Sequence, residues 1–149
     1  MSKYTSNNEL SHFDFNEAVI SEIRLMNGAF IIYADNVKIL PENSHNHDIR
    51  TMRTNELEFC ITNAQIISFI EEGYKIYDAD GNLSTTINDR SISFEEYANE
   101  FKTLSGCIIY EISKNDNIYE ISIDTEDHTY AVKVSGDSNI IKWDRFLNL

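Results

Sequence analysis

The stretch that decides the fold is IIYEISKNDNIYEISIDTEDHTYAVKV, which runs from Ile108 to Val134. Apolar and polar residues alternate along three runs in it, and two short polar segments, residues 114–117 and 125–128, separate the runs. Such alternation is typical of strands, because successive side chains of a strand point to opposite faces. The stretch therefore predicts three antiparallel strands in a meander, apolar on one face and wet on the other.

The two faces of this predicted meander differ in composition. The expected buried face takes residues from each strand: Ile108, Tyr110 and Ile112; Tyr119, Ile121 and Ile123; Tyr130, Val132 and Val134. The other face and the turns are acidic, since the sequence from Gly106 to Asp127 contains six acids and one lysine. It is either a solvated sheet face, which antiparallel sheets commonly have, or a docking surface for a basic partner. The candidate partner-binding residues are Glu111, Glu120, Asp124, Glu126 and Asp127.

The preceding segment, residues 77–97, contains pieces of a calcium-binding loop. An EF-hand loop needs oxygen ligands at fixed positions, a glycine at its sixth position and a glutamate at its twelfth. Counted from Asp78, the sixth position is Leu83 and the twelfth is Asp89. We therefore expect no calcium site here. The residues expected not to converge on one ion are Asp78, Asp80, Asn82, Asp89 and Glu96.

The same segment predicts a β-hairpin followed by a helix. The Asp-Gly pair within residues 78–82 is a strong signal for a tight turn between two strands. Ser93 and Glu96 then form the pattern of a capping box, in which each side chain bonds a free backbone N–H at the start of a helix. Apolar residues follow at helical spacing, and Gly106 is the expected stop. These helical residues are Phe94, Tyr97, Ala98, Phe101 and Leu104.

Strands dominate the rest of the chain. A hairpin is expected within residues 17–34 around an Asn-Gly turn, and a half-buried strand at residues 57–61. Residues 65–70 fit either a strand or a helix, and their β-branched side chains favour a strand. Residues 140–146 fit a fourth strand or a short helix, with Trp143 in the core or in a lid.

These patterns predict an α+β domain that spans residues 1–149 and consists mainly of antiparallel sheet, from hairpins and the C-terminal meander. One principal helix is expected near residues 94–103. Residues 1–12 are expected to be disordered, because chain termini are often poorly ordered unless they are tied down.

Composition limits the classes of partner. Acids outnumber lysine and arginine by 25 to 12, which gives a formal net charge of −13. We expect neither nucleic acid nor a membrane surface as a partner, because both require basic residues on the protein. The N-terminus lacks the apolar segment of a signal peptide, and no stretch is apolar enough to span a membrane, so a cytoplasmic protein is expected. Cys60 and Cys107 are accordingly expected to be reduced thiols that pack in the sheet.

The sequence contains no recognised catalytic motif. The nucleophile-elbow, phosphate-loop, CxxC and HExxH patterns are all missing. We therefore expect no enzymatic activity and no cofactor. His45, His47 and Asp48 are weak candidates for a metal site in the loop at residues 41–53. A metal site needs a third and usually a fourth ligand, and no partner motif at a fixed spacing supplies them.

Charge gives the remaining indication of function. The sequence favours a non-catalytic binding protein whose acidic surface captures a basic protein partner. In charge and size the chain is similar to small acidic bacterial immunity proteins, which block cationic nuclease toxins. Two alternatives remain: a β-rich domain that holds a small molecule or metal near residues 41–53, and an enzyme without a recognisable motif.

Overall fold

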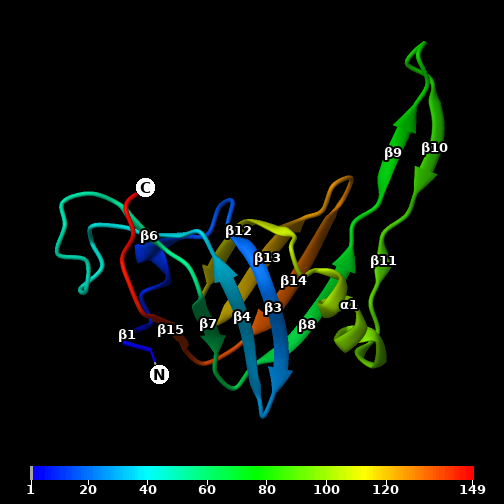
Figure 1. Ribbon diagram of the computed structural model, residues 1–149. Coiled ribbons are helices and arrows are strands. Elements are labelled where there is room, and N and C mark those ends of the chain that lie inside the picture. Colours follow the sequence, from blue (N-terminus) through cyan, green and yellow to red (C-terminus); the bar gives the residue numbers. More distant parts are fainter. Residues whose placement is uncertain (1) are drawn as a thin grey trace.

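The computed structural model describes residues 2–149 (Figure 1). Most strands belong to one ten-stranded antiparallel sheet with the order β1-β15-β7-β4-β3-β12-β13-β14-β8-β11. In that order the strands are Tyr4–Asn7, Asn139–Trp143, Leu57–Ile61, Ala29–Asp35, Val19–Met26, Ile108–Asn115, Ile118–Asp124, Thr129–Ser135, Gln65–Glu71 and Arg90–Ser91. The predicted fold class, mainly antiparallel sheet with one principal helix, is confirmed for these residues.

Two small sheets and a few helical turns complete the chain. A three-stranded sheet contains β2 (Phe13–Asp14), β5 (Val37–Ile39) and β6 (Met52–Thr54), and a two-stranded sheet contains β9 (Tyr74–Tyr77) and β10 (Leu83–Ile87). The helical elements are the 3-10 turns η1 (Leu10–His12) and η2 (Phe94–Glu96) and the helix α1 (Tyr97–Thr103).

The large sheet folds over on itself and encloses the core. Strands β7 and β13 are four positions apart in the sheet, roughly 19 Å at the usual strand spacing. The rings of Phe59 on β7 and Tyr119 on β13 nevertheless lie only 6.2 Å apart. Phe101 of α1 fills the space between the walls and contacts Phe30 on β4 and Phe69 on β8. Helix α1 therefore packs inside the curve of the sheet, beside β3 and with Phe101 against β8.

The meander is present, with one correction. The expected buried residues of β13 and β14 are buried, and those two strands pair in register from Ile118 to Asp124. On β12 the alternation is wrong, because Ile109 is buried whereas Ile108 is 43% and Tyr110 56% exposed. The β12–β13 register shifts between Ile109 and Glu111. A bulge there adds one residue to β12, so the residues before it face the opposite way from the simple pattern.

The two chain ends were predicted less well than the middle. We expected residues 1–12 to be disordered, but Tyr4–Asn7 form β1 and Leu10–His12 form η1. β1 pairs with β15, and Tyr4 stacks on Trp143 with ring centroids 5.6 Å apart. Of the two alternatives for the last segment, the strand is correct, and Trp143 is a core residue with no exposed surface. Residues 65–71 form β8, as favoured.

The helix begins differently from the predicted capping box. The Ser93 hydroxyl donates to Glu96 Oε1 at 2.8 Å and accepts no hydrogen bond from a backbone N–H, and the first turn is the 3-10 turn η2. Phe94 is consequently 72% exposed, whereas Phe101 and Leu104 are buried as expected. A 3-10 turn has three residues per turn, which rotates Phe94 away from the stripe that α1 buries.

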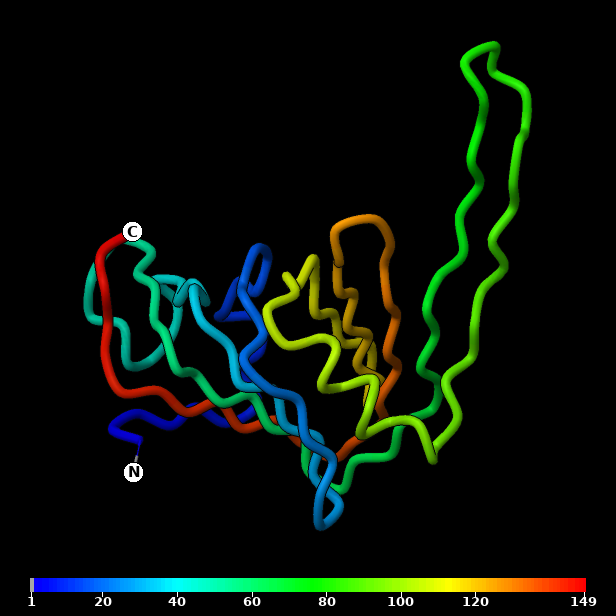
Figure 2. Tube along the Cα trace, turned by 45° about the vertical axis from the view of Figure 1, so that its right-hand side comes forward, coloured from blue at the N-terminus to red at the C-terminus, as the bar shows by residue number. Residues whose placement is uncertain are grey.

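The β9–β10 hairpin projects from the body of the molecule, as Figures 1 and 2 both show. Its strands pair antiparallel around the predicted turn, whose Asp78 carboxylate accepts hydrogen bonds from the backbone N–H groups of Asp80 and Asn82, both at 2.9 Å. Every residue of both strands is exposed. The turn prediction is therefore confirmed, while the projection away from the core had no signal in the sequence.

Candidate functional site

The predicted acidic residues lie on the exposed side and at one end of the meander. Glu111 on β12 and Glu120 on β13 are exposed, and Glu120 Oε1 lies 3.5 Å from Lys133 Nζ on β14. Asp124 is half-buried at the end of β13, where it accepts a hydrogen bond from Thr129 Oγ1 at 3.1 Å. Lys133 thus neutralises part of the negative charge at Glu120, whereas Glu111 has an exposed carboxylate.

The β12 bulge leaves two apolar residues, Ile108 and Tyr110, exposed on this surface. Ile108 lies opposite Asp124 in the β12–β13 ladder. A groove of about 690 Å³ is lined by Ile108, Tyr110, Asp124 and Glu126 together with neighbouring residues of the β2–β3 and α1–β12 connections. An exposed aromatic side chain bordered by carboxylates is therefore present where the sequence predicted only polar groups.

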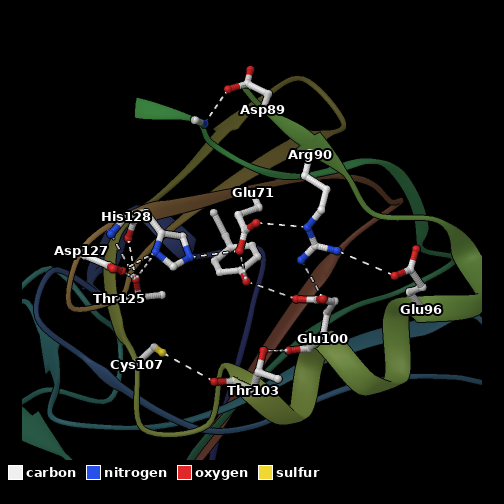
Figure 3. Close-up of polar contacts among 12 residues, drawn as sticks. Glu71, Asp89, Arg90, Glu96, Glu100, Thr103, Cys107, Thr125, Asp127 and His128 are labelled. Atoms are coloured by element: carbon white, nitrogen blue, oxygen red, sulfur yellow. Dashed lines mark hydrogen bonds and ion pairs between the residues drawn. The ribbon is translucent and has the colours of Figure 1, made fainter. Parts of the chain in front are cut away.

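A cluster of polar side chains beneath the projecting hairpin was missed by sequence reasoning (Figure 3). Glu71, the last residue of β8, is its centre. Its Oε1 accepts from Arg90 Nε at 3.1 Å, and its Oε2 accepts from the Tyr130 hydroxyl at 2.7 Å. His128 Nε2 lies 3.1 Å from the same Oε2. The cluster combines residues from β8, β11 and β14 and the turn before β14, which are far apart in the sequence.

Arg90 extends the cluster to the helix. Its Nη2 donates to Glu100 Oε1 at 2.8 Å, and its Nη1 lies 3.7 Å from Glu96 Oε2. The Tyr130 hydroxyl is also 3.1 Å from Glu100 Oε2. One guanidinium thus holds β8 and α1 together at the point where the hairpin returns to the body, through β11.

The electrostatics of the cluster favour the charged forms of Glu71, Arg90 and His128 and the neutral form of Tyr130. Hydrogen bonds from Arg90 and then Tyr130 lower the pKa of Glu71, and the bonds to Glu71 and Glu100 raise the pKa of Arg90. Burial, followed by the bond to Glu71, raises the pKa of Tyr130. The hydrogen bond to Asp127 is the largest cause that raises the pKa of His128, and Glu71 adds to it. A carboxylate that is held ionised and already accepts several bonds is poorly suited to proton transfer near neutral pH.

The candidate metal residues do not converge. His45 Nε2 is 2.9 Å from the Thr5 carbonyl oxygen, and the His45 ring packs edge-on to Trp143. Asp48 instead pairs with Arg50 at 3.1 Å, and these bonds from Arg50 lower the pKa of the Asp48 carboxyl. Within residues 2–149, no three His, Cys, Asp or Glu side chains are grouped so as to hold a metal ion.

The residues of the calcium-like segment are spread along the hairpin. Asp78 and Asp80 lie at its tip, whereas Asp89 accepts a hydrogen bond from the Gly73 N–H at its base. Cys60 and Cys107 are both free thiols, and burial raises the pKa of each, which disfavours a reactive thiolate.

A second groove, of about 680 Å³, lies between β3 and α1. Ile23, Leu25 and Phe101 are among its apolar lining residues. The lining also contains Arg24 and Glu22, which bond to each other at 2.7 Å, and the charged residues Glu95 and Lys102. This groove has the size of a ligand site.

No family model, curated protein or solved structure matches this chain. In the part of the chain that the structure describes, every helix is too short to cross a membrane.

Proposed function

We propose that this protein is a non-catalytic binding protein that captures a basic protein partner. The binding surface contains the acidic residues of the meander with an apolar centre: Glu111, Glu120, Asp124, Glu126, Asp127, Ile108 and Tyr110. The observation that carries the proposal is the position of Tyr110, which is 56% exposed in a groove that also contains Asp124 and Glu126.

This arrangement has the anatomy of a protein interface. Binding energy in such interfaces is concentrated in a few central residues, among which tyrosine is enriched, and a polar rim surrounds them. Tyr110 and Ile108 supply the centre, while Asp124 and Glu126 supply negative charge at the rim. With a net charge of −13, the protein also attracts cationic proteins at long range and accelerates their association.

The polar cluster at Glu71 supports a binding role rather than catalysis. Its charged groups are bonded to one another, since Arg90 contacts both Glu71 and Glu100, and Tyr130 contacts the same two carboxylates. A catalytic site needs groups left available for a substrate. The cluster instead joins β8, β11, β14 and α1 beside the proposed surface.

The test compares wild-type protein with Glu111→Lys/Glu120→Lys/Asp124→Lys as immobilised bait in a cell extract. Captured proteins are identified, purified and used to measure association rates at low and high salt. We expect the wild type to capture a basic protein, and the variant to associate with it more slowly and with a weaker dependence on salt.

A matched control separates the surface from net charge. Glu42→Lys/Glu56→Lys/Glu95→Lys changes the net charge equally, at exposed positions outside the proposed surface. The control should retain most of the wild-type association rate at low salt. Equal rates for wild type and the meander variant at low salt, or equal losses in both variants, would reject the proposed surface.

A further inference from the structure

We infer that the β9–β10 hairpin is a second docking arm, which binds an extended, cationic segment of a protein by pairing it with the free edge of β10. The inference rests on the proposed function, because it assigns this arm to the same class of basic partner. The arm is a second surface, and it binds by strand pairing. It therefore requires an extended segment in the partner, which the meander surface does not.

The hairpin presents apolar side chains to solvent on an element that has little else to stabilise it. Its Tyr77 is 58% and Leu83 54% exposed, and Tyr74, Ile76 and Ile87 are exposed as well. An isolated two-stranded hairpin is marginally stable in water. The cross-strand register places Tyr74, Ile76 and Ile87 on one face of the hairpin, and Tyr77 and Leu83 on the other. Exposed apolar residues grouped in this way commonly mark an interaction site. Burial of these side chains by a partner would give the hairpin the stabilising apolar contacts that the body of the protein does not provide.

Apart from the register shift between Leu83 and Thr85, the free edge of β10 lacks the usual protection against strand pairing. Natural sheets guard exposed edges with lysine, other charges or proline. β9 carries Lys75, whereas β10 reads LSTTI, without charge or proline. In the two-stranded sheet each strand has one partner, so the outer backbone groups of β10 face away from β9. Addition of a strand to such an edge is a common mode of peptide recognition.

The negative charge of the arm favours a basic segment as the partner at this edge. Between Glu72 and Asp89 the chain carries four acids, Glu72, Asp78, Asp80 and Asp89, and the single base Lys75. A second copy of the chain would bring the same excess of negative charge to the edge, which opposes self-association. A segment that alternates apolar and basic residues meets both the apolar side chains and the acids of the arm.

The arm is continuous with the proposed meander surface. His128 links Asp127, in the acidic turn, to Glu71 at the base of the hairpin. Next to it the Glu72 N–H donates to the Thr129 carbonyl at 2.8 Å. Figures 1 and 2 show the β13–β14 turn and the hairpin on the same side of the molecule. One partner can therefore contact both surfaces.

The base of the arm is built to hold it in a fixed direction. Gly73 N–H donates to Asp89 Oδ1 at 2.6 Å across the two strands of the base. A Cβ atom at Gly73 would lie 2.0 Å from the Ile87 carbonyl oxygen, so only glycine fits at this crossing. Arg90 follows immediately and bonds to Glu71 and Glu100. A fixed arm loses less conformational entropy on binding than a flexible loop.

The experiment uses full-length protein and a defined probe, a short synthetic peptide of alternating lysine and valine. Amide hydrogen exchange is followed with and without the peptide. With peptide at about ten times its Kd, amides of β10 should exchange about tenfold more slowly, because only the unbound fraction exchanges freely. A glutamate–valine peptide of equal length is the charge control and should give no protection.

Two variants, each replacing two exposed apolar side chains with serine, localise the effect. Tyr77→Ser/Leu83→Ser lies on the arm and should abolish the protection of β10. Ile49→Ser/Phe94→Ser removes exposed residues elsewhere and should leave it unchanged. Protection confined to the meander, or protection by the acidic peptide, would overturn the inference. If β10 is protected but reversal of the meander acids leaves capture unaffected, the arm stands and the proposed meander surface fails.

Discussion

The β13–β14 and β9–β10 hairpins have similar sequences, but the first is half-buried and the second is exposed. Both are antiparallel pairs of β-branched and aromatic residues joined by acidic turns. In β13 and β14 alternate residues are buried in the core, whereas every residue of β9 and β10 is exposed. The local sequence sets strand pairing in both, but contacts with distant segments decide which pair carries the stability of the fold.

This difference assigns separate tasks to the two regions. The buried pair loses apolar surface to the core and stabilises the fold in proportion to that area. The exposed pair contributes little to the core and depends on the cluster at Glu71 and Arg90 for its position. Substitutions in the first region should therefore act on global stability, and substitutions in the second on local order and binding.

The largest expected effect is at the centre of the buried pair. Ile121 is 1% exposed, and Ile121→Ala should lower the free energy of unfolding by about 2–4 kcal/mol through lost burial and a residual cavity. The matched change Ile76→Ala on the hairpin should stay within about 0.5 kcal/mol. Urea denaturation followed by fluorescence measures both. Similar losses at the two positions would show that the hairpin belongs to the cooperative core.

A smaller effect is expected where the two regions meet. Arg90→Met removes the cation that holds Glu71 and Glu100, and should cost about 1 kcal/mol, since hydrogen bonds to charged groups are worth more than neutral ones but this guanidinium is partly exposed. Amide exchange in β9 and β10 should accelerate more than exchange in β13. Arg24→Met, which breaks the exposed pair with Glu22, is the control and should leave hairpin exchange unchanged.

The alternation of apolar and polar residues predicts the buried faces of some strands correctly and of others wrongly. Alternation in β13 and β14 predicted their faces correctly, because both strands run without interruption along the core. The same rule failed on β12, where the bulge near Tyr110 depends on register with β13 and with Val19 of β3. The alternation predicts Tyr110 on the buried face, whereas its side chain is 56% exposed. A bulge of this kind leaves no mark in a single sequence.

The candidate site was less predictable than the fold. The acids of the meander could be named from charge alone, although Lys133 next to Glu120 and the apolar centre could not. The Glu71 cluster combines residues separated by up to 59 positions, so no motif with a fixed spacing records it. The projection of the hairpin likewise depends on tertiary structure, because no other segment covers the strands β9 and β10. These features arise from tertiary contacts, and a single sequence carries no direct signal for them.

A pH effect is expected at the His128 link between the two regions. Asp127 and Glu71, the charged groups that face it, raise its pKa above the ordinary value of 6.5, so its contribution to stability is present below that value and is lost as pH rises through the folded-state pKa. Glu71 has the opposite sign: its lowered pKa gives stability above 4.5 that is lost as pH falls.

The measurement compares wild type and His128→Gln by urea denaturation near pH 5.5 and near pH 8. The stability difference in favour of wild type should be larger at the lower pH and shrink at the higher one. Titrating groups that do not contact His128 are common to both proteins, so their effects cancel in the difference. A difference that grows with pH would mean that His128 is stabilised as the neutral imidazole.

The smallest stability effect, and the sharpest contrast with binding, is expected at Glu111. Its exposed carboxylate lies on the wet side of the β12–β13 ladder opposite Ser122, so Glu111→Ala should change the free energy of unfolding by no more than about 0.5 kcal/mol. If the meander surface steers a basic partner, the same substitution should slow association at low salt, and the difference from wild type should shrink at high salt, because salt screens exposed charges. Ser113→Ala, a neutral neighbour on the same face, should change neither quantity. A loss of stability at Glu111 without any change in association rate would give this side chain a structural role and remove it from the proposed surface.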